Sequence, residues 1–293
     1  MKGVLLQLKN RIKDLFRNGY HARNSICIKN VIYDDGDAEI CRGDLYTPEG
    51  KESRAVIFYI KGGLFGGVAK SRRRGYAARL ADRGYTVFVP EYGEGSEGYE
   101  ACLNRLLKAE SWLKRNPQQV GASGKMLIFA ETTGAALAVE LILLKRDTAY
   151  RSARGIETTP IGFHGAVLFS SVWDLDKALA GKLPRALRKH LDQWNASTED
   201  LGGIAPTSKI TTFVPTFVAY NARVEPVNRQ SKALLSRLRS IGIPIWEYCA
   251  SYRNPPVNWQ LDGSELSELL NRDVDAFVEQ ITEGRPSPKY IEI

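Results

Sequence analysis

The sequence predicts an α/β protein with a mostly parallel central sheet and helices on both faces. Short apolar runs, typical of strands buried on both faces, alternate with amphipathic helical segments along most of the chain. The clearest apolar run is residues 55–60, and a glycine-rich stretch at residues 62–67 follows it directly. The chain has 293 residues, of which 43% are hydrophobic, so it can bury a core of this kind.

The first part of the chain precedes this alternation. Residues 2–17 carry apolar side chains at helical spacing, with lysines and arginines on another face. This pattern predicts an amphipathic helix within residues 1–24 that either docks on the body of the protein over a pocket mouth or touches a membrane. Two alternating strands follow at residues 25–33 and 38–46, and the acidic stretch between them, residues 34–37, predicts a turn.

Residues 25–293 are expected to form a single domain. Beyond the first two strands, further strands are predicted at residues 55–60, 85–89, 126–129, 165–169, 216–220 and 244–249. Helices are predicted at residues 76–83, 99–115, 135–145, 229–241 and 262–282. Residues 173–212 are rich in charge and glycine and interrupt this rhythm, which indicates a small cap inserted between two strands.

Composition narrows the classes of function. The net charge is 41 − 33 = +8, but the basic residues are scattered, so no nucleic-acid partner is expected. The densest basic run, residues 70–74, is interpreted as a solvated helix start. No apolar run approaches the ~18 residues of a membrane span, and the four cysteines form no metal-binding motif. We therefore expect a cytoplasmic protein without metal, cofactor or stable membrane insertion; the sequence is compatible with a homo-oligomer.

One junction between a strand and a helix carries chemical information. It reads Ala130-Glu131-Thr132-Thr133-Gly134. In the nucleophile elbow G-x-S-x-G, a sharp turn of this kind exposes a hydroxyl above the sheet, and small flanking residues allow the strand and helix to approach. The stretch therefore predicts an elbow with Thr132 at its tip.

The surrounding motifs match in order. Lys61-Gly62-Gly63-Leu64-Phe65 corresponds to an H-G-G-G-[FW] oxyanion loop, and residues 90–92 match the end of the next strand. Residues 111–116 match the helix before the elbow, and residues 215–218 match the strand before the acidic triad member. Over residues 40–285 the chain resembles the esterase/lipase branch of the α/β-hydrolase family, close to hormone-sensitive-lipase-like esterases. The resemblance implies an α/β-hydrolase fold.

The chain departs from that family at every triad position. Thr132 stands in place of serine, and the acid position falls near Val224, where only Glu225 can substitute. Residues 250–255, where the family places its histidine, contain none. The three histidines of the chain are His21, His164 and His190. His164 is expected to be structural, whereas His21 or His190 would be a nonstandard base.

The candidate site lies around the elbow. The candidate catalytic residues are Lys61, Glu131, Thr132 and Tyr252. The candidate ligand-binding residues are Gly62, Gly63, Leu64, Thr133 and Arg253. Two alternatives are open for Lys61: an internal salt bridge to Glu91 or Glu131, or a cation aimed at an anionic ligand. Gly62 and Gly63 either point their N–H groups into the pocket or only make the turn.

Three functions fit these residues. The first is non-hydrolytic small-molecule chemistry of the lyase, cyclase, isomerase or decarboxylase type, which needs a shaped pocket but no acyl-enzyme. The second is a non-catalytic protein that binds a ligand or partner. The third is an esterase with a rearranged catalytic set that uses Thr132. In the first two cases we expect a small-molecule ligand that is apolar or anionic in part.

Overall fold

The computed structural model describes residues 23–62, 69–93, 97–120, 124–157, 162–174, 209–251, 260 and 264–284. The predicted helix within residues 1–24 therefore lies almost wholly outside the described residues. Most of the predicted cap, residues 173–212, also lies outside them.

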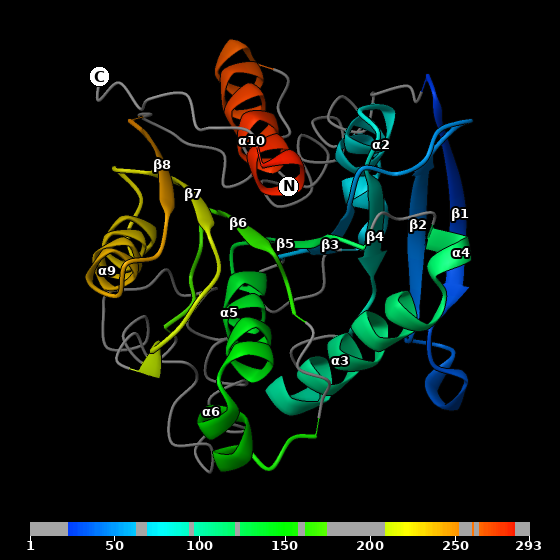
Figure 1. The fold of residues 1–293 in the computed structure, drawn as a ribbon, viewed down its shortest axis with the longest axis horizontal. Coiled ribbons are helices and arrows are strands. Elements are labelled where there is room, and N and C mark those ends of the chain that lie inside the picture. Colours follow the sequence, from blue (N-terminus) through cyan, green and yellow to red (C-terminus); the bar gives the residue numbers. More distant parts are fainter. Residues whose placement is uncertain are drawn as a thin grey trace, which may run out of the picture.

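Eight strands form one sheet in the order β1-β2-β4-β3-β5-β6-β7-β8 (Figure 1). The strands are β1 Ser25–Ile32, β2 Arg42–Pro48, β3 Val56–Ile60, β4 Thr86–Pro90, β5 Met126–Glu131, β6 Gly165–Phe169, β7 Thr216–Asn221 and β8 Ile245–Ala250. From β4 to β8 all neighbouring strands are parallel, while β2 runs antiparallel to both β1 and β4. The predicted mostly parallel sheet is confirmed.

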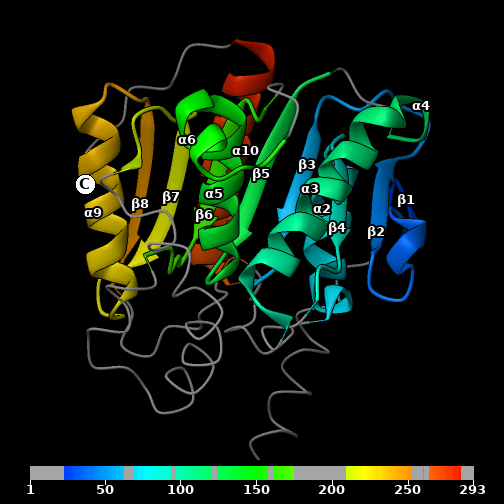
Figure 2. The same cartoon turned by 90° about the horizontal axis from the view of Figure 1, so that it is seen from below.

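Helices cover both faces of the sheet, as Figures 1 and 2 show. Helices α2 Arg74–Asp82 and α10 Glu265–Glu283 pack on one face. The other face carries α3 Tyr99–Arg115, α5 Gly134–Arg146 and α9 Val227–Ser240, together with the short α4 Pro117–Val120 and α6 Thr148–Ala153. Two short 3-10 helices, η1 Asp35–Asp37 and η2 Lys70–Arg73, complete the described elements.

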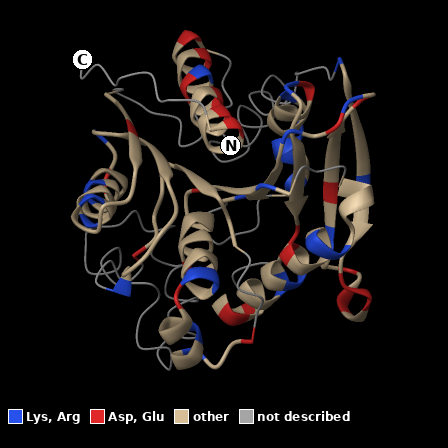
Figure 3. Cartoon of the chain, viewed as in Figure 1, with Lys and Arg blue, Asp and Glu red and all other residues tan. Residues whose placement is uncertain are grey.

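The central strands are buried because their side chains are apolar on both faces. Every residue of β3, β5, β6 and β7 is buried. In Figure 3 these central strands are almost free of charged positions, whereas the helices, the loops and the outer strands β1, β2 and β8 carry them. The one charged residue in these four strands is Glu131. It is the last residue of β5 and lies at the start of the candidate site.

Several elements differ from the sequence prediction, which also lacked the short helix α4. The second strand begins at Arg42 rather than residue 38, because the preceding acidic stretch winds into η1 and Cys41 N–H donates to the Asp37 carbonyl oxygen. The short helix α6 was not predicted. Its amino end is capped by Asp147, whose side chain accepts a hydrogen bond from Tyr150 N–H.

The parallel strands bring the predicted motifs to one edge of the sheet. The loop after β3, the segment after β4 and the turn after β5 all follow carboxyl ends of adjacent parallel strands. In open α/β sheets ligands bind at this edge. The candidate site is therefore built from segments that are far apart in the sequence.

Candidate functional site at the carboxyl edge of the sheet

Thr132 forms the tip of a sharp turn between β5 and α5. Its φ angle is 48°, in the left-handed region that a β-branched residue rarely adopts. Two backbone hydrogen bonds hold the turn: Thr132 N–H donates to the Phe169 carbonyl oxygen (3.0 Å), and Val172 N–H donates to the Thr132 carbonyl oxygen (3.0 Å). The turn has the form of the elbow that the sequence predicted.

The loop after β3 packs directly against this elbow. A Cβ atom placed on Gly62 would lie 1.8 Å from Thr132 Oγ1, and one on Gly134 would lie 2.7 Å from the Lys61 carbonyl oxygen. No side chain fits at either position. The two glycines are therefore required by the close approach of the loop and the elbow.

Glu131 is fully buried and its carboxylate is bound on both oxygens. Oε1 accepts a hydrogen bond from Gly62 N–H (3.1 Å) and pairs with Arg73 Nε. Oε2 accepts from Gln260 Nε2 at 3.1 Å. The carboxylate is thus neutralised by a buried guanidinium and holds the loop, the elbow and Gln260 together.

Lys61 is also buried, with 2% of its surface exposed, and forms an ion pair with Glu91. Its Nζ lies 2.8 Å from Glu91 Oε2 and 4.5 Å from the centroid of the Tyr92 ring. The other Glu91 oxygen accepts a hydrogen bond from Lys70 N–H (2.8 Å). Of the two salt-bridge partners that the sequence allowed, the structure has Glu91 and not Glu131.

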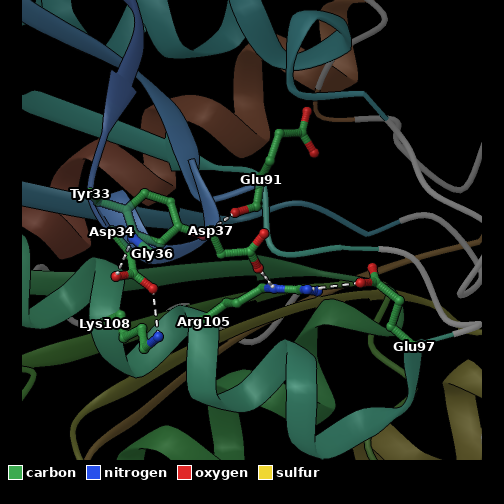
Figure 4. Close-up of polar contacts among 8 residues, drawn as sticks. All are labelled: Tyr33, Asp34, Gly36, Asp37, Glu91, Glu97, Arg105 and Lys108. Carbon is green, nitrogen blue, oxygen red and sulfur yellow. Dashed lines mark hydrogen bonds and ion pairs between the residues drawn. The ribbon is translucent and has the colours of Figure 1, made fainter. Parts of the chain in front are cut away.

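Residues that follow β1 and residues on α3 make polar contacts around the segment that carries Glu91 (Figure 4). The Tyr33 hydroxyl donates to the Glu91 carbonyl oxygen. Arg105 on α3 bridges two acidic groups, with Nε 2.9 Å from Asp37 and Nη2 2.8 Å from Glu97. The carboxylate that pairs with Lys61 therefore lies on a segment whose backbone is anchored by a hydrogen bond from Tyr33.

Tyr92 closes the lysine side of the site. Its hydroxyl donates to the Lys61 carbonyl oxygen, and burial raises the pKa of Tyr92 well above its ordinary value. The side chain therefore stays protonated and acts as a donor to the backbone. It is not available as a general base near neutral pH.

The expected triad positions contain no assembled set among the described residues. Glu225 is exposed and accepts a hydrogen bond from Asn228 Nδ2 (3.2 Å), as a residue of a surface turn. His164 Nδ1 accepts from Met126 N–H (3.2 Å) at the amino ends of β5 and β6, the opposite edge from Thr132. His21 and His190 lie outside the described residues.

The structure brings together five of the predicted site residues: Lys61, Gly62, Glu131, Thr132 and Thr133, all buried. The Gly62 N–H group donates to Glu131 rather than pointing into an open pocket. The other four predicted site residues, Gly63, Leu64, Tyr252 and Arg253, lie outside the described residues.

Two residues of the site were not predicted from the sequence. The basic run that includes Arg73 was interpreted as solvated, yet Arg73 is 4% exposed and pairs with Glu131. The start of α2 at Arg74 agrees with the helix-start part of that interpretation. Gln260 lies between two stretches outside the described residues and carries no motif. A buried elbow carboxylate signals that some cation must approach it, but not which one.

Within the described ranges, no three His, Cys, Asp or Glu side chains are grouped so as to hold a metal ion. Of the helices that the structure describes, none combines the length and apolar character needed to cross a membrane.

The sheet order, the helices on both faces and the elbow define the α/β-hydrolase fold of esterases and lipases. Solved structures support this assignment over nearly the whole chain. Esterase B from Lactobacillus rhamnosis HN001 superposes with a TM-score of 0.82 at 14% identity, covering 97% of this chain and 95% of the esterase. A hormone-sensitive lipase from a metagenome library gives 0.71 at 14% identity, covering 94% and 91%.

Esterase LipW from Mycobacterium marinum gives a TM-score of 0.69 at 15% identity, covering 94% of this chain and 88% of the esterase. No protein-family model matches the sequence, and no curated protein matches it. The similarity is thus one of fold, and the function has to be argued from the site.

Proposed function

We propose that this chain is a non-hydrolysing member of the α/β-hydrolase fold that binds a small molecule at the carboxyl edge of its sheet. The observation that carries the proposal is the state of the two charged groups beside the elbow. Lys61 is paired with Glu91, and Glu131 is paired with Arg73. Both pairs are internal to the protein.

Acyl transfer needs a base that removes the proton of the attacking hydroxyl. The chain has no histidine after His190, so the family position for the base is empty. Glu131 is the carboxylate next to Thr132 in the chain, but its oxygens accept hydrogen bonds from Gly62, Arg73 and Gln260. Both oxygens of this carboxylate are thus already engaged by donors of the protein, and Thr132 Oγ1 is not one of them. Binding without covalent chemistry is therefore favoured.

Non-hydrolytic catalysis, of the lyase, cyclase, isomerase or decarboxylase type, is the second candidate. The observation that favours it is the φ angle of 48° at Thr132. Strain of this kind clusters at functional sites, and the chain keeps it although a glycine would relieve it. A hydroxyl held at the elbow can orient or protonate a substrate without becoming a nucleophile.

The third candidate, an esterase with a rearranged set, would use Thr132 as nucleophile with His21 or His190 as base. Its support is the fold shared with esterases. It requires that a β-branched nucleophile act from the elbow, where the extra methyl group of threonine restricts the side-chain rotamer.

The test is the hydrolysis of p-nitrophenyl butyrate by the full chain and by Thr132→Ala at matched concentration. We expect both proteins to show only the background rate of buffer, because no base activates the hydroxyl. Circular dichroism of both proteins controls for folding. Turnover at esterase-like rates that disappears in Thr132→Ala would refute the proposal in favour of the third candidate.

Native mass spectrometry of the purified protein separates the first two candidates. A binding protein is expected to release a co-purified small molecule unchanged after prolonged incubation at 25 °C. A change in the mass of the released molecule during that incubation would favour non-hydrolytic catalysis instead.

A further inference from the structure

Several neutral polar groups at the carboxyl edge remain without a hydrogen-bond partner among the described residues, and three of them stand on adjacent strand ends. Thr132 Oγ1, Ser171 Oγ and Asn221 Nδ2 are buried and have no hydrogen-bond partner among the described residues. Thr132, Ser171 and Asn221 are 5%, 1% and 2% exposed. Buried polar groups are nearly always hydrogen-bonded, so three open ones at one edge require an explanation.

These groups stand on three adjacent strand ends. Thr132 follows β5, and the residue after Ser171, Val172, donates its N–H to the Thr132 carbonyl oxygen. Phe169 of β6 is in register with Ala219 of β7, and Ser170 N–H donates to the Ala219 carbonyl oxygen (2.8 Å), so Ser171 and Asn221 each lie two residues beyond this pair in the chain. Since neighbouring strands lie about 4.8 Å apart, the three backbones fall within about two strand spacings.

Two of the groups are also held in place. Asn221 Oδ1 accepts a hydrogen bond from Arg223 N–H (2.8 Å), so Nδ2 is the part of the amide left open. The segment after Ser171 is fixed to α9 by Gln230, whose side chain accepts from Trp173 N–H (2.9 Å) and donates to the Asp174 carbonyl oxygen (2.9 Å). Groups fixed in this way lose little entropy when a ligand binds.

We infer that Thr132, Ser171 and Asn221 form a hydrogen-bonding site for a neutral ligand that carries hydroxyl or carbonyl oxygens. This inference rests on the proposed function and deepens it by naming the ligand class. Two hydroxyls and an amide N–H suit oxygen acceptors without formal charge. Among the described residues, the two buried cations at the elbow, Lys61 and Arg73, already pair with carboxylates and so offer no free charge to an anionic ligand. The inference thus favours a neutral ligand over the partly anionic one that the sequence also allowed.

The experiment compares glycerol monobutyrate, which is neutral and carries an ester and two hydroxyls, with butyrate. Binding to the full chain is measured by ligand-observed NMR titration at pH 7. We expect glycerol monobutyrate to bind at least tenfold more tightly than butyrate. Failure to bind glycerol monobutyrate, or butyrate binding as tightly, would overturn the inference.

Variants test the residues. Ser171→Ala removes one hydroxyl, and Asn221→Asp keeps the acceptor for Arg223 N–H while removing the open donor. Each is expected to weaken glycerol monobutyrate binding about five- to tenfold, the usual effect of one lost hydrogen bond. Tyr85→Phe is the matched control, since the Tyr85 hydroxyl is also buried and without a hydrogen-bond partner among the described residues, but lies at the amino edge of the sheet.

Binding unchanged in both site variants, or weakened equally in Tyr85→Phe, would contradict the inference. The same titration tests the proposed function by a separate outcome. If glycerol monobutyrate is hydrolysed during the titration, that function is wrong. A higher KM in Ser171→Ala and Asn221→Asp would then still support the site, and an unchanged KM would overturn it.

Discussion

A substitution at Lys61 distinguishes a structural role of this residue from a ligand-binding role. Lys61→Met leaves Glu91 without its cation, although that carboxylate keeps the Lys70 N–H bond and is 26% exposed. We expect a loss of about 2 kcal/mol in the free energy of unfolding, between the values typical of exposed and buried pairs. Urea denaturation measures it.

The control for this prediction is the double variant Lys61→Met/Glu91→Gln. Because the stranded charge is removed, the double variant should cost clearly less than the sum of the two single changes. Additive costs would show that the ion pair contributes nothing. Unchanged stability together with lost ligand binding would instead make Lys61 a ligand residue.

Thr132 permits a test of backbone strain. Thr132→Gly and Thr132→Ala both remove the hydroxyl, but alanine keeps the Cβ that is unfavourable at a φ of 48°. The glycine variant should be more stable than the alanine variant by about 1 kcal/mol, measured by thermal unfolding. An alanine variant of equal or greater stability would show that the elbow is unstrained or relaxes.

For individual residues, the sequence predicted the elbow but not the partners of the side chains around it. The spacing of small residues around Thr132 and the glycines after β3 are local signals, and each was read from a few consecutive letters. The partners of Glu131 are not local. Arg73 and Gln260 reach it from positions 58 and 129 residues away, and no short pattern links them to the elbow.

Helices α3 and α5 are joined by an ion pair that is fully buried. Lys145 Nζ lies 2.8 Å from Glu110 Oε2, and neither side chain is exposed. Lys145→Met should lower the free energy of unfolding by about 3–5 kcal/mol, because among the described residues it leaves the buried Glu110 carboxylate with Lys114 as its one remaining partner. Urea denaturation again provides the measurement.

Replacing both partners supplies the control. Lys145→Met/Glu110→Met removes the buried charges together, so we expect it to recover most of the loss. A double variant as unstable as Lys145→Met alone would mean that packing of the two helices, and not the stranded charge, sets the cost.

Most elements were predictable because their signals are local. Continuous apolar runs identified the central strands, and Gly84 and Gly242 marked helix ends, both with positive φ angles. The late start of β2 was not predictable. Alternation from residue 38 favoured a strand, but the bond from Cys41 N–H to the Asp37 carbonyl oxygen extends the turn instead.

For the whole molecule, the strand–helix alternation was sufficient to predict a parallel sheet with helices on both faces. Right-handed crossovers and short connections then leave few ways to arrange the strands. The function did not follow from the fold, because the same sheet serves many chemistries. The proposed function depends on which side chains at the carboxyl edge remain unpaired. The sequence did not show this, because the pairing of Lys61 with Glu91 and of Glu131 with Arg73 is known only from the structure.

The most direct test of the account is the reaction of the protein with a fluorophosphonate. Such reagents form a covalent bond with a serine or threonine hydroxyl that a base has activated. We treat wild type and Thr132→Ser with the reagent and read the intact mass of each protein. The account predicts no adduct on either, because a change of nucleophile does not supply the missing base. A stoichiometric adduct mapped to residue 132 in either protein would contradict it.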